Sequence, residues 1–446
     1  MRAHFLRAAA GNKEEGEKGL FLVLNDSRGF EDDRSPIEID SDNNIYVTCN
    51  ERSNSDGRQQ VSVIKINEDG GAVWDKQFSR TNTGFIYAES HYDGTHLYVV
   101  MQYFNPARTY VVKLDTDGAI QWSRELSMSN RDVRFAPPVN KDNSGNVLVS
   151  AQSEYPNFND WYSGLFKLSD STGAPIDFSG TREALRYGRS SDFYYPAGAV
   201  TDSNGNIYQA GFRTSGTDRS YIIKYNSSGS RQLEREFYLG SGSYNTRVRD
   251  IQIGSNGNIY MIGSMGSSHL FIFALTPTFS THLYRVYAMN SLPVLPRIRF
   301  DSNGNYYVMT NNDPSAYNNG AVVMKFNSSN AQQWQRQIHY SGRNFQTRGL
   351  AVNDTHFAIS GCDLSIGSPY TFDQFFVAML PGDGSKTGTY GSSSEYIYTT
   401  ATFNTISASG SISSTNRGVS NLPFNDAAGN ISNSNADVTV NQLTTI

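Results

Sequence analysis

The stretch DSNGNIY at Asp202–Tyr208 decides the fold, because the chain repeats it. It returns as GSNGNIY at Gly254–Tyr260 and as DSNGNYY at Asp301–Tyr307, with looser versions at Asp40–Tyr46 and Asp142–Leu148. An Asn-Gly pair suits a tight turn that needs positive φ, and the apolar residues after it suit the start of a strand. The sequence therefore predicts one hairpin turn, used again and again.

The spacing of this turn indicates a repeat architecture. The apolar residues that follow the successive turns are separated by 52, 50, 60, 52, 47 and 51 residues. Seven copies with a period near 50 residues are typical of a repeat protein built from one supersecondary unit. The seven positions are Ile45, Leu97, Val147, Ile207, Ile259, Tyr306 and Phe357.

Each copy has the same internal plan of four short strands. A brief apolar strand precedes the turn, a second strand follows it, and a third strand ends in Lys and an apolar residue, as in VSVIKIN, TYVVKLD and SYIIKYN. Nine residues after the Lys comes Trp or another large apolar residue, at Lys65/Trp74, Lys113/Trp122, Lys224/Leu233 and Lys325/Trp334. Four-stranded antiparallel units repeated seven times predict an all-β fold, a seven-bladed β-propeller.

The last copy lacks a good fourth strand, and the N-terminal part of the chain supplies one. QFFVAML at Gln374–Leu380 fits the third strand, but the following GSKTGTYG lacks the apolar pair. LFLVL at Leu20–Leu24 has that pair. We expect it to close the ring as the outer strand of the last blade, which removes exposed strand edges. The predicted organisation is an N-terminal extension over 1–19, the propeller over 20–391 and a β-prone, low-complexity extension over 392–446.

Charge and cysteine content exclude several classes of function. The net charge is −5 and the isoelectric point is near 5.8, so no basic surface for nucleic acid or an anionic membrane is expected. No apolar run reaches the length of a membrane-spanning helix. Two cysteines are too few for a disulfide scaffold and lack metal-site spacing.

The blade pattern resembles the bacterial and phage β-propeller repeat family with NHL/SBBP-like blades. The stretches DSNGNIY, YIIKYNSSG and VVKLDTDGAIQW carry the resemblance, which covers roughly Leu20–Gly391. It implies a propeller and is nearly silent on function, because this family shares no catalytic residues.

The C-terminal extension is similar in composition to tails on virion proteins of marine tailed phages, being rich in Ser, Thr, Asn and Gly. This likeness predicts a non-enzymatic structural or recognition protein of a virion, as a tail, fibre or decoration part. Its partners would be other virion proteins or further copies of itself, and a host surface glycan is a further expected ligand. The strand-like stretches EYIYTTATF and ADVTVNQLTTI would anchor it by adding strands to a partner.

The alternative prediction is a secreted bacterial propeller that binds or hydrolyses carbohydrate. Hydrolysis needs two carboxyl groups, or a Tyr with a Glu, facing one cleft. Glu154, Asp160, Glu183 and Asp192 are available, but the sequence does not bring them together. A carboxylate pair converging on the central channel would favour this alternative.

No catalytic residue, cofactor or metal site is predicted. The Asp and Asn residues of the repeated turn offer oxygen ligands for calcium, but a downstream bidentate Glu is missing. These residue types are also expected in tight turns for backbone reasons.

The best candidate for a binding surface is the pair of long loops in the third copy, which crowd aromatic and arginine side chains. Such loops suit contact with a glycan or a protein, since aromatic faces supply area and polar groups supply orientation. Alternatively, the rings fold back to cover the edge of the blade. The candidate residues are Tyr155, Phe158, Trp161, Tyr162, Arg186, Tyr187, Arg189, Tyr194 and Tyr195.

Overall fold

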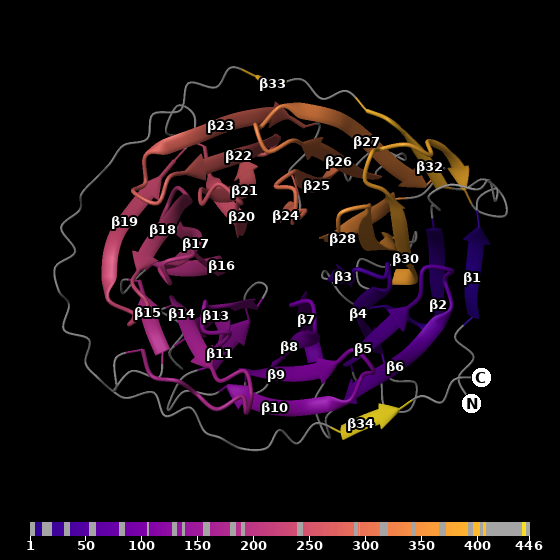
Figure 1. The fold of residues 1–446 in the computed structure, drawn as a ribbon, viewed down its shortest axis with the longest axis horizontal. Helices are drawn as coiled ribbons and strands as arrows, with labels where there is room; N and C mark the ends of the chain where they lie inside the picture. The colour runs from indigo at the N-terminus through magenta and orange to yellow at the C-terminus, as the bar shows by residue number, and fades with distance from the viewer. Residues whose placement is uncertain are drawn as a thin grey trace.

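The computed structural model is an all-β ring in which the successive repeat units follow one another around a central axis (Figure 1). No helix that could span a membrane occurs in the described part of the chain. The structure describes residues 5–10, 20–30, 36–52, 59–79, 85–104, 107–126, 132–135, 139–154, 161–178, 184–188, 192–238, 244–289, 293, 295–312, 320–340, 344–364, 372–390, 396–401, 405–406 and 439–442.

Each repeat unit is an antiparallel sheet whose first strand lies nearest the axis and whose last strand lies at the rim (Figure 1). The first unit comprises β3 (Ile37–Ile39), β4 (Ile45–Arg52), β5 (Gln59–Ile66) and β6 (Ala72–Ser79). The second comprises β7 (Phe85–Tyr92), β8 (His96–Phe104), β9 (Ala107–Asp115) and β10 (Ile120–Leu126). The third comprises β11 (Asp132–Phe135), β12 (Asn140–Lys141), β13 (Val147–Glu154), β14 (Trp161–Leu168) and β15 (Ala184–Tyr187).

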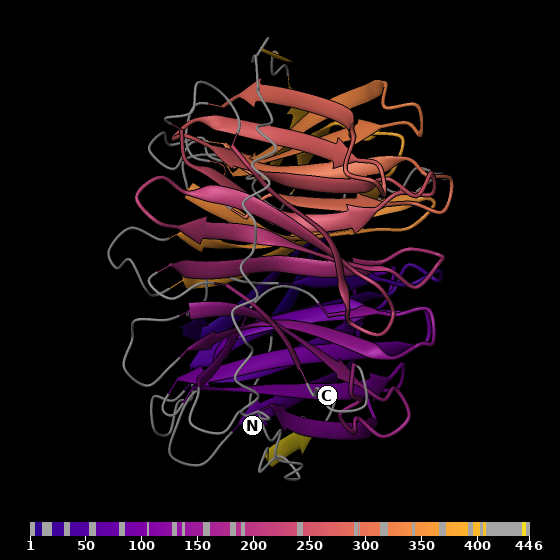
Figure 2. The same ribbon diagram turned by 90° about the vertical axis from the view of Figure 1, so that its left-hand side faces the viewer.

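The next three units follow the same order and complete most of the ring. The fourth unit comprises β16 (Phe193–Thr201), β17 (Ile207–Thr214), β18 (Arg219–Tyr225) and β19 (Arg231–Phe237). The fifth comprises β20 (Thr246–Ile253), β21 (Ile259–Met265), β22 (His269–Leu275) and β23 (Thr281–Ala288). The sixth comprises β24 (Arg297–Phe300), β25 (Tyr306–Asn312), β26 (Gly320–Phe326) and β27 (Gln332–Tyr340). Seen from the side, the turns collect on the two faces of the ring (Figure 2).

The last unit combines both ends of the propeller sequence. β28 (Asn344–Val352), β29 (His356–Leu364) and β30 (Phe372–Pro381) pair in order, and β2 (Leu20–Phe30) pairs antiparallel with β30. The register places Leu20 opposite Met379 and Leu24 opposite Phe375. The N-terminal segment thus supplies the outer strand of this unit.

The chain forms the predicted all-β propeller, but the predicted count of seven blades is not observed, because hydrogen-bonded pairing groups the described strands into five sheets. Two pairs of neighbouring units are merged, each through a single residue pair. Phe30 pairs with Glu51 and joins the last unit to the first, and Trp161 pairs with Phe193 and joins the third unit to the fourth. The four-stranded units persist within the merged sheets.

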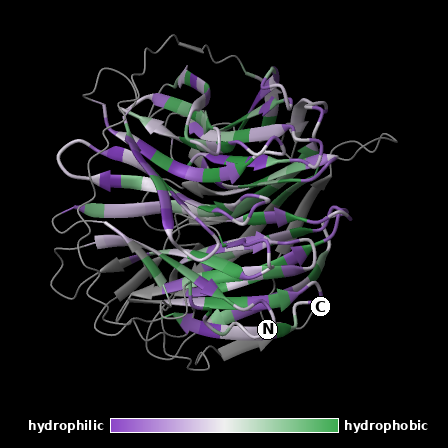
Figure 3. Cartoon of the chain, turned by 60° about the vertical axis from the view of Figure 1, so that its left-hand side comes forward, coloured by the Kyte–Doolittle hydropathy of each residue, from purple (hydrophilic) through white to green (hydrophobic). Residues whose placement is uncertain are grey.

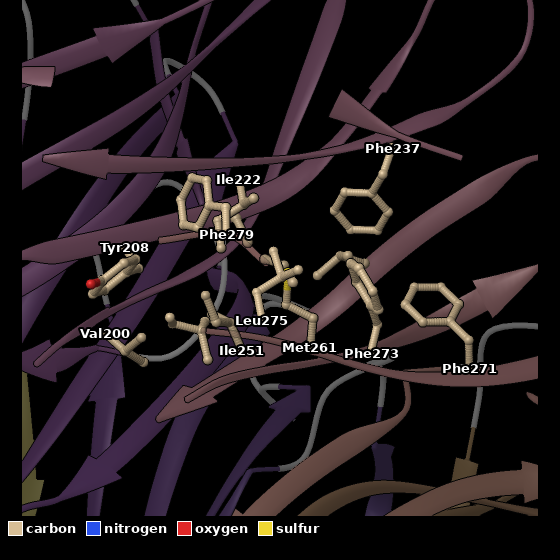
Figure 4. Close-up of a cluster of buried hydrophobic side chains, with 14 of the residues drawn as sticks. Val200, Tyr208, Ile222, Phe237, Ile251, Met261, Phe271, Phe273, Leu275 and Phe279 are labelled. Atoms are coloured by element: carbon tan, nitrogen blue, oxygen red, sulfur yellow. The ribbon is translucent and has the colours of Figure 1, made fainter. Parts of the chain in front are cut away.

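Apolar packing between neighbouring units holds the ring together. The buried apolar side chains of the described residues form seven clusters, and each lies between two successive units. Figure 4 shows the cluster in which Tyr208 and Phe237 of one unit meet Ile251, Met261 and Phe273 of the next. Hydrophobic and hydrophilic segments alternate along the strands (Figure 3), as burial of one sheet against another requires.

The repeated DSNGNIY turn is stabilised by its own aspartate. One carboxylate oxygen of Asp202 accepts the backbone N–H groups of Asn204 and Asn206, both at 2.9 Å. The other oxygen accepts the Asn206 amide at 2.8 Å and the Tyr208 hydroxyl at 2.9 Å. Gly205 has a φ of 79°, which the tight turn requires. Both oxygens that a calcium ion would need are therefore used by the turn itself.

The Lys and Trp nine residues apart form a clasp, in which both side chains donate hydrogen bonds to one backbone carbonyl of the next unit. Lys113 Nζ and Trp122 Nε1 both donate to the carbonyl oxygen of Asp170, at 3.1 and 2.7 Å. The indole lies over Gly173 in the same turn, where an added Cβ would meet ring atoms at 2.6 Å. Lys65 Nζ and Trp74 Nε1 likewise both donate to the carbonyl oxygen of Thr116.

Strands outside the repeat add to the rim of the ring. β1 (Phe5–Ala10) pairs with β2, β31 (Gly388–Tyr390) pairs with β32 (Tyr396–Thr400), β32 pairs with β27, β33 (Thr405–Ile406) pairs with β23, and β34 (Thr439–Gln442) pairs with β6. In this structure the C-terminal strands pair within the same chain. The boundary of the extension and its role toward a partner stay predictions.

The clasp predicts that two glycine substitutions in the third unit lower the free energy of unfolding by different amounts. Gly173→Ala should lower the free energy of unfolding by about 1–2 kcal/mol for its left-handed φ and by about 1–3 kcal/mol more for the clash with Trp122. Gly145→Ala should show only the first loss, because its φ is +80° and an added Cβ meets nothing within 4 Å. Denaturant unfolding of both variants measures the difference. Equal losses would contradict the role given to the indole.

Candidate functional site

The first strands of several units bring ionisable side chains to the axis of the ring. Glu38 lies on β3, Glu89 and His91 on β7, and Asp250 on β20. Arg297 and Arg299 lie on β24. Because side chains two apart on a strand share a face, residues two and four positions before each turn stack in two layers.

The deeper layer contains the residues four positions before the turn, Glu89, Asp250 and Arg297. All three are buried, with exposed fractions of 2%, 0% and 4%. Arg297 forms an ion pair with Glu89, which is 208 residues away in the sequence. This pair joins β24 to β7, two strands of units that are not neighbours in the ring.

The shallower layer contains the residues two positions before the turn, Glu38, His91 and Arg299, and it is partly exposed. Arg299 Nη1 lies 2.7 Å from Asp250 Oδ2, so the shallower layer is tied to the deeper one. The second hydrogen bond of Asp250 Oδ2 comes from the backbone N–H of Ile298 at 3.0 Å.

Among the described residues, the charges of this cluster leave one carboxyl group without a salt-bridge partner. Arg297 is paired with Glu89, and Arg299 is paired with Asp250. Burial therefore dominates at Glu38 and raises its pKa to about 8, against the opposing charge of Arg299 and with a further contribution from Glu89. At neutral pH, Glu38 is a protonated carboxylic acid beside an ion-paired carboxylate.

The imidazole of His91 is uncharged at neutral pH. Burial lowers the pKa of His91 to about 4, and the nearby cations Arg299 and Lys141 lower it further, while Asp93 opposes them. The shallower layer thus holds a neutral acid and a neutral base that both lie close to Arg299.

This cluster was not predicted from the sequence. The carboxylates considered there were Glu154, Asp160, Glu183 and Asp192, of which Asp160 and Glu183 lie outside the described residues. Glu154 ends β13, and Asp192 interacts with Arg213 at 3.4 Å. The available signal was charge at alternate positions of strands that should be apolar, as in ESH at Glu89–His91 and RIR at Arg297–Arg299.

The aromatic candidate residues divide into two groups. Tyr162 and Tyr194 are buried, and Tyr187 packs on Tyr194 at 5.3 Å and donates to Glu234 at 2.6 Å. Trp161 and Tyr195 are partly exposed, with ring centroids 5.7 Å apart. Some of these rings are therefore packed inside, and others are partly exposed at the surface.

The partly exposed Trp161 and Tyr195 continue into a row that passes through the buried Phe212 and ends in an arginine. Tyr195 stacks on Phe212 at 4.8 Å, and the Arg249 guanidinium lies 4.8 Å from the centre of the Phe212 ring. Tyr155, Phe158 and Arg189 lie outside the described residues, and only the backbone of Arg186 is described, within β15. A binding role for this surface stays a prediction.

Comparisons with known proteins give only distant structural likenesses. No family model matches the chain, and the curated proteins give no match. The resemblances to the propeller repeat family and to phage tails therefore stay predictions. Among solved structures, an ulvan lyase described as a polysaccharide lyase has a TM-score of 0.46 at 10% identity and covers 85% of this chain and 95% of its own.

Two other solved structures are similar at the same level. The NanB sialidase of Streptococcus pneumoniae has a TM-score of 0.41 at 8% identity, covering 80% of this chain and 70% of its own. An α-L-arabinanase of Penicillium chrysogenum has a TM-score of 0.39 at 9% identity, covering 80% and 98%. The prediction that the chain is not an enzyme is contradicted, because these solved structures with related architecture are enzymes. At these values no particular activity passes to this chain.

The raised pKa of Glu38 predicts a pH-dependent stability. The folded protein holds a proton on Glu38 between pH 4.5, its ordinary pKa, and about 8, whereas the unfolded chain releases it. Unfolding is therefore favoured progressively as the pH rises through this window. Glu38→Gln, which stays neutral, should be about 2 kcal/mol more stable than the wild type at pH 9 and similar at pH 4. Thermal unfolding at both pH values tests this, and a pH-independent difference would contradict it.

Proposed function

We propose that the chain cleaves a glycosidic bond at the inner-strand cluster, with Glu38 as the proton donor to the leaving oxygen. One observation carries this proposal, the convergence of Glu38 and Glu89 on the axis of the ring. In such an arrangement the neutral carboxyl group acts as the acid, and the ionised carboxyl group beside it stabilises charge.

The neighbours of Glu38 support this role. The two arginines of β24 are already paired with Glu89 and Asp250, so neither holds Glu38 in its ionised form. Glu38 is also partly exposed, so its side chain is not sealed off from solvent. A general acid works best when its pKa lies near the working pH, and a value of about 8 meets that condition.

In this proposal the aromatic row is a separate contact for a long glycan, because Trp161 and Tyr195 lie at the ends of their strands away from the repeated turn, whereas Glu38 lies beside it. The faces of Trp161 and Tyr195 offer the area on which sugar rings pack, and Arg249 offers hydrogen-bond donors. A protein with this activity would work outside a cell, either secreted or carried on a virion. Both locations, and any partner subunits, are part of the proposal.

The test is cleavage of polysaccharides by the full chain, followed as newly formed reducing ends. Glu38→Gln should lower the rate at least about 100-fold, because it removes the proton donor. Glu68→Gln is the matched control, since Glu68 is exposed in a turn of the first unit. The rate of the wild type should fall above about pH 8, where Glu38 ionises. A Glu38→Gln variant as active as the control would refute the role of Glu38.

A further inference from the structure

We propose that the site acts on glycans that contain a uronic acid and breaks them by β-elimination, with His91 as the base and Glu38 as the acid. This inference rests on the proposed function and adds the base, the substrate class and the reaction type. It comes from the way the charged groups at the axis are already paired.

The described carboxylates at the axis are poorly placed to act as a base or nucleophile. Glu89 is 2% exposed and ion-paired with Arg297. Asp250 is fully buried and accepts hydrogen bonds from Arg299 and from the backbone of Ile298. Hydrolysis by two carboxyl groups needs an accessible ionised carboxylate beside the acid. At this layer the partly exposed proton acceptor is His91 instead.

His91 and Glu38 occupy equivalent positions on neighbouring inner strands. Each stands two residues before the turn aspartate of its unit, Asp93 or Asp40, and the charge of Arg299 acts on both side chains. A substrate held against Arg299 would therefore lie between a base and an acid.

Arg299 fits the carboxylate of a uronic acid. Its described hydrogen bonds, to Asp250 and to the carbonyl of Ile298, both come from Nη1. The Nη2 side of the guanidinium is then the edge that meets a second carboxylate, in the paired geometry that arginine favours. Neutralising that carboxylate acidifies the neighbouring C5–H, which is the proton that must leave.

The step balances without an oxidant or a further reactant. His91 takes the C5 proton, the electron pair of that bond forms the C4=C5 double bond, and the C4–O4 bond breaks. Glu38 gives its proton to the departing O4. The site ends as an imidazolium and a carboxylate, and proton exchange with solvent restores the starting state.

Other charged groups set the pH range of this chemistry. His91 faces Arg299 from β24, Lys141 from β12 and Asp93 at the end of its own strand. Glu38 faces Arg299 and Arg297 from β24, Glu89 from β7 and the backbone of Tyr92. His91 is unprotonated above about pH 4, and Glu38 is protonated below about pH 8. We therefore expect the cleavage rate to be constant between these values and to fall outside them.

The experiment incubates the full chain with glucuronan, alginate and pectate, and with the carboxyl-reduced form of each. Two readouts are taken together, the ultraviolet absorbance of the new C4=C5 double bond and the number of reducing ends. We expect both to rise on the uronans and neither on the reduced polymers. Reducing ends without absorbance would overturn the elimination and leave the proposed function standing. No cleavage of any uronan, with cleavage of a neutral glycan, would overturn the substrate class. No cleavage of any glycan would overturn both.

Two variants separate the roles of the base and the acid. His91→Gln should lose at least about 100-fold in the rate of double-bond formation, while His282→Gln, on the exposed part of β23, serves as the matched control. In deuterated water, Glu38→Gln should still exchange the substrate C5 proton without cleaving, because its base is intact. His91→Gln should lose that exchange as well. Equal exchange in the two variants, both folded by circular dichroism, would overturn the assignment of His91.

Discussion

The clasp between one unit and the turn of the next is the contact on which the ring depends. A lysine and a tryptophan nine residues apart both donate to one backbone carbonyl, as Lys113 and Trp122 do at Asp170. The indole then covers the glycine of the same turn. Because the clasp ties the rim of one sheet to the next sheet, it fixes their relative rotation and stacks their apolar faces. Two of the seven buried clusters, those that contain Trp74 and Trp122, lie at the interfaces held in this way.

This rotation also brings the inner strands together at the axis, where charge replaces apolar packing. Two arginines of β24 pair with two carboxylates from β7 and β20. A third carboxyl, Glu38, forms no ion pair with any residue that the structure describes, and burial keeps it protonated near neutral pH. A buried ion pair contributes little net stability after its desolvation cost. Burying the unpaired Glu38 beside this ion pair lowers the stability of the fold, and packing alone does not explain why it is there. Ionisable groups with such strongly shifted pKa values are typical of functional sites.

The fold could be predicted from the sequence because its signals are local and repeated. The DSNGNIY turn, the Lys and Trp spacing and the closure of the last unit by Leu20–Leu24 each depend on residues a few positions apart, or on their recurrence. The merging of units into five sheets could not be predicted, since it depends on single pairs such as Trp161–Phe193. The axial cluster was missed for a related reason. Arg297 and Glu89 are 208 residues apart, and only the closed ring makes them neighbours.

Closure through β2 has a consequence for how the chain folds. Leu20 and Leu24 are synthesised early, but their partners Met379 and Phe375 emerge from the ribosome only after nearly the whole propeller. β2 can pair with β1 at once, but its other edge, which pairs with β30, must stay open or be protected while the other units form. Contacts so distant in sequence raise the contact order and slow folding. A nascent chain with such an open edge is exposed to misassembly and chaperone capture until the last unit is complete.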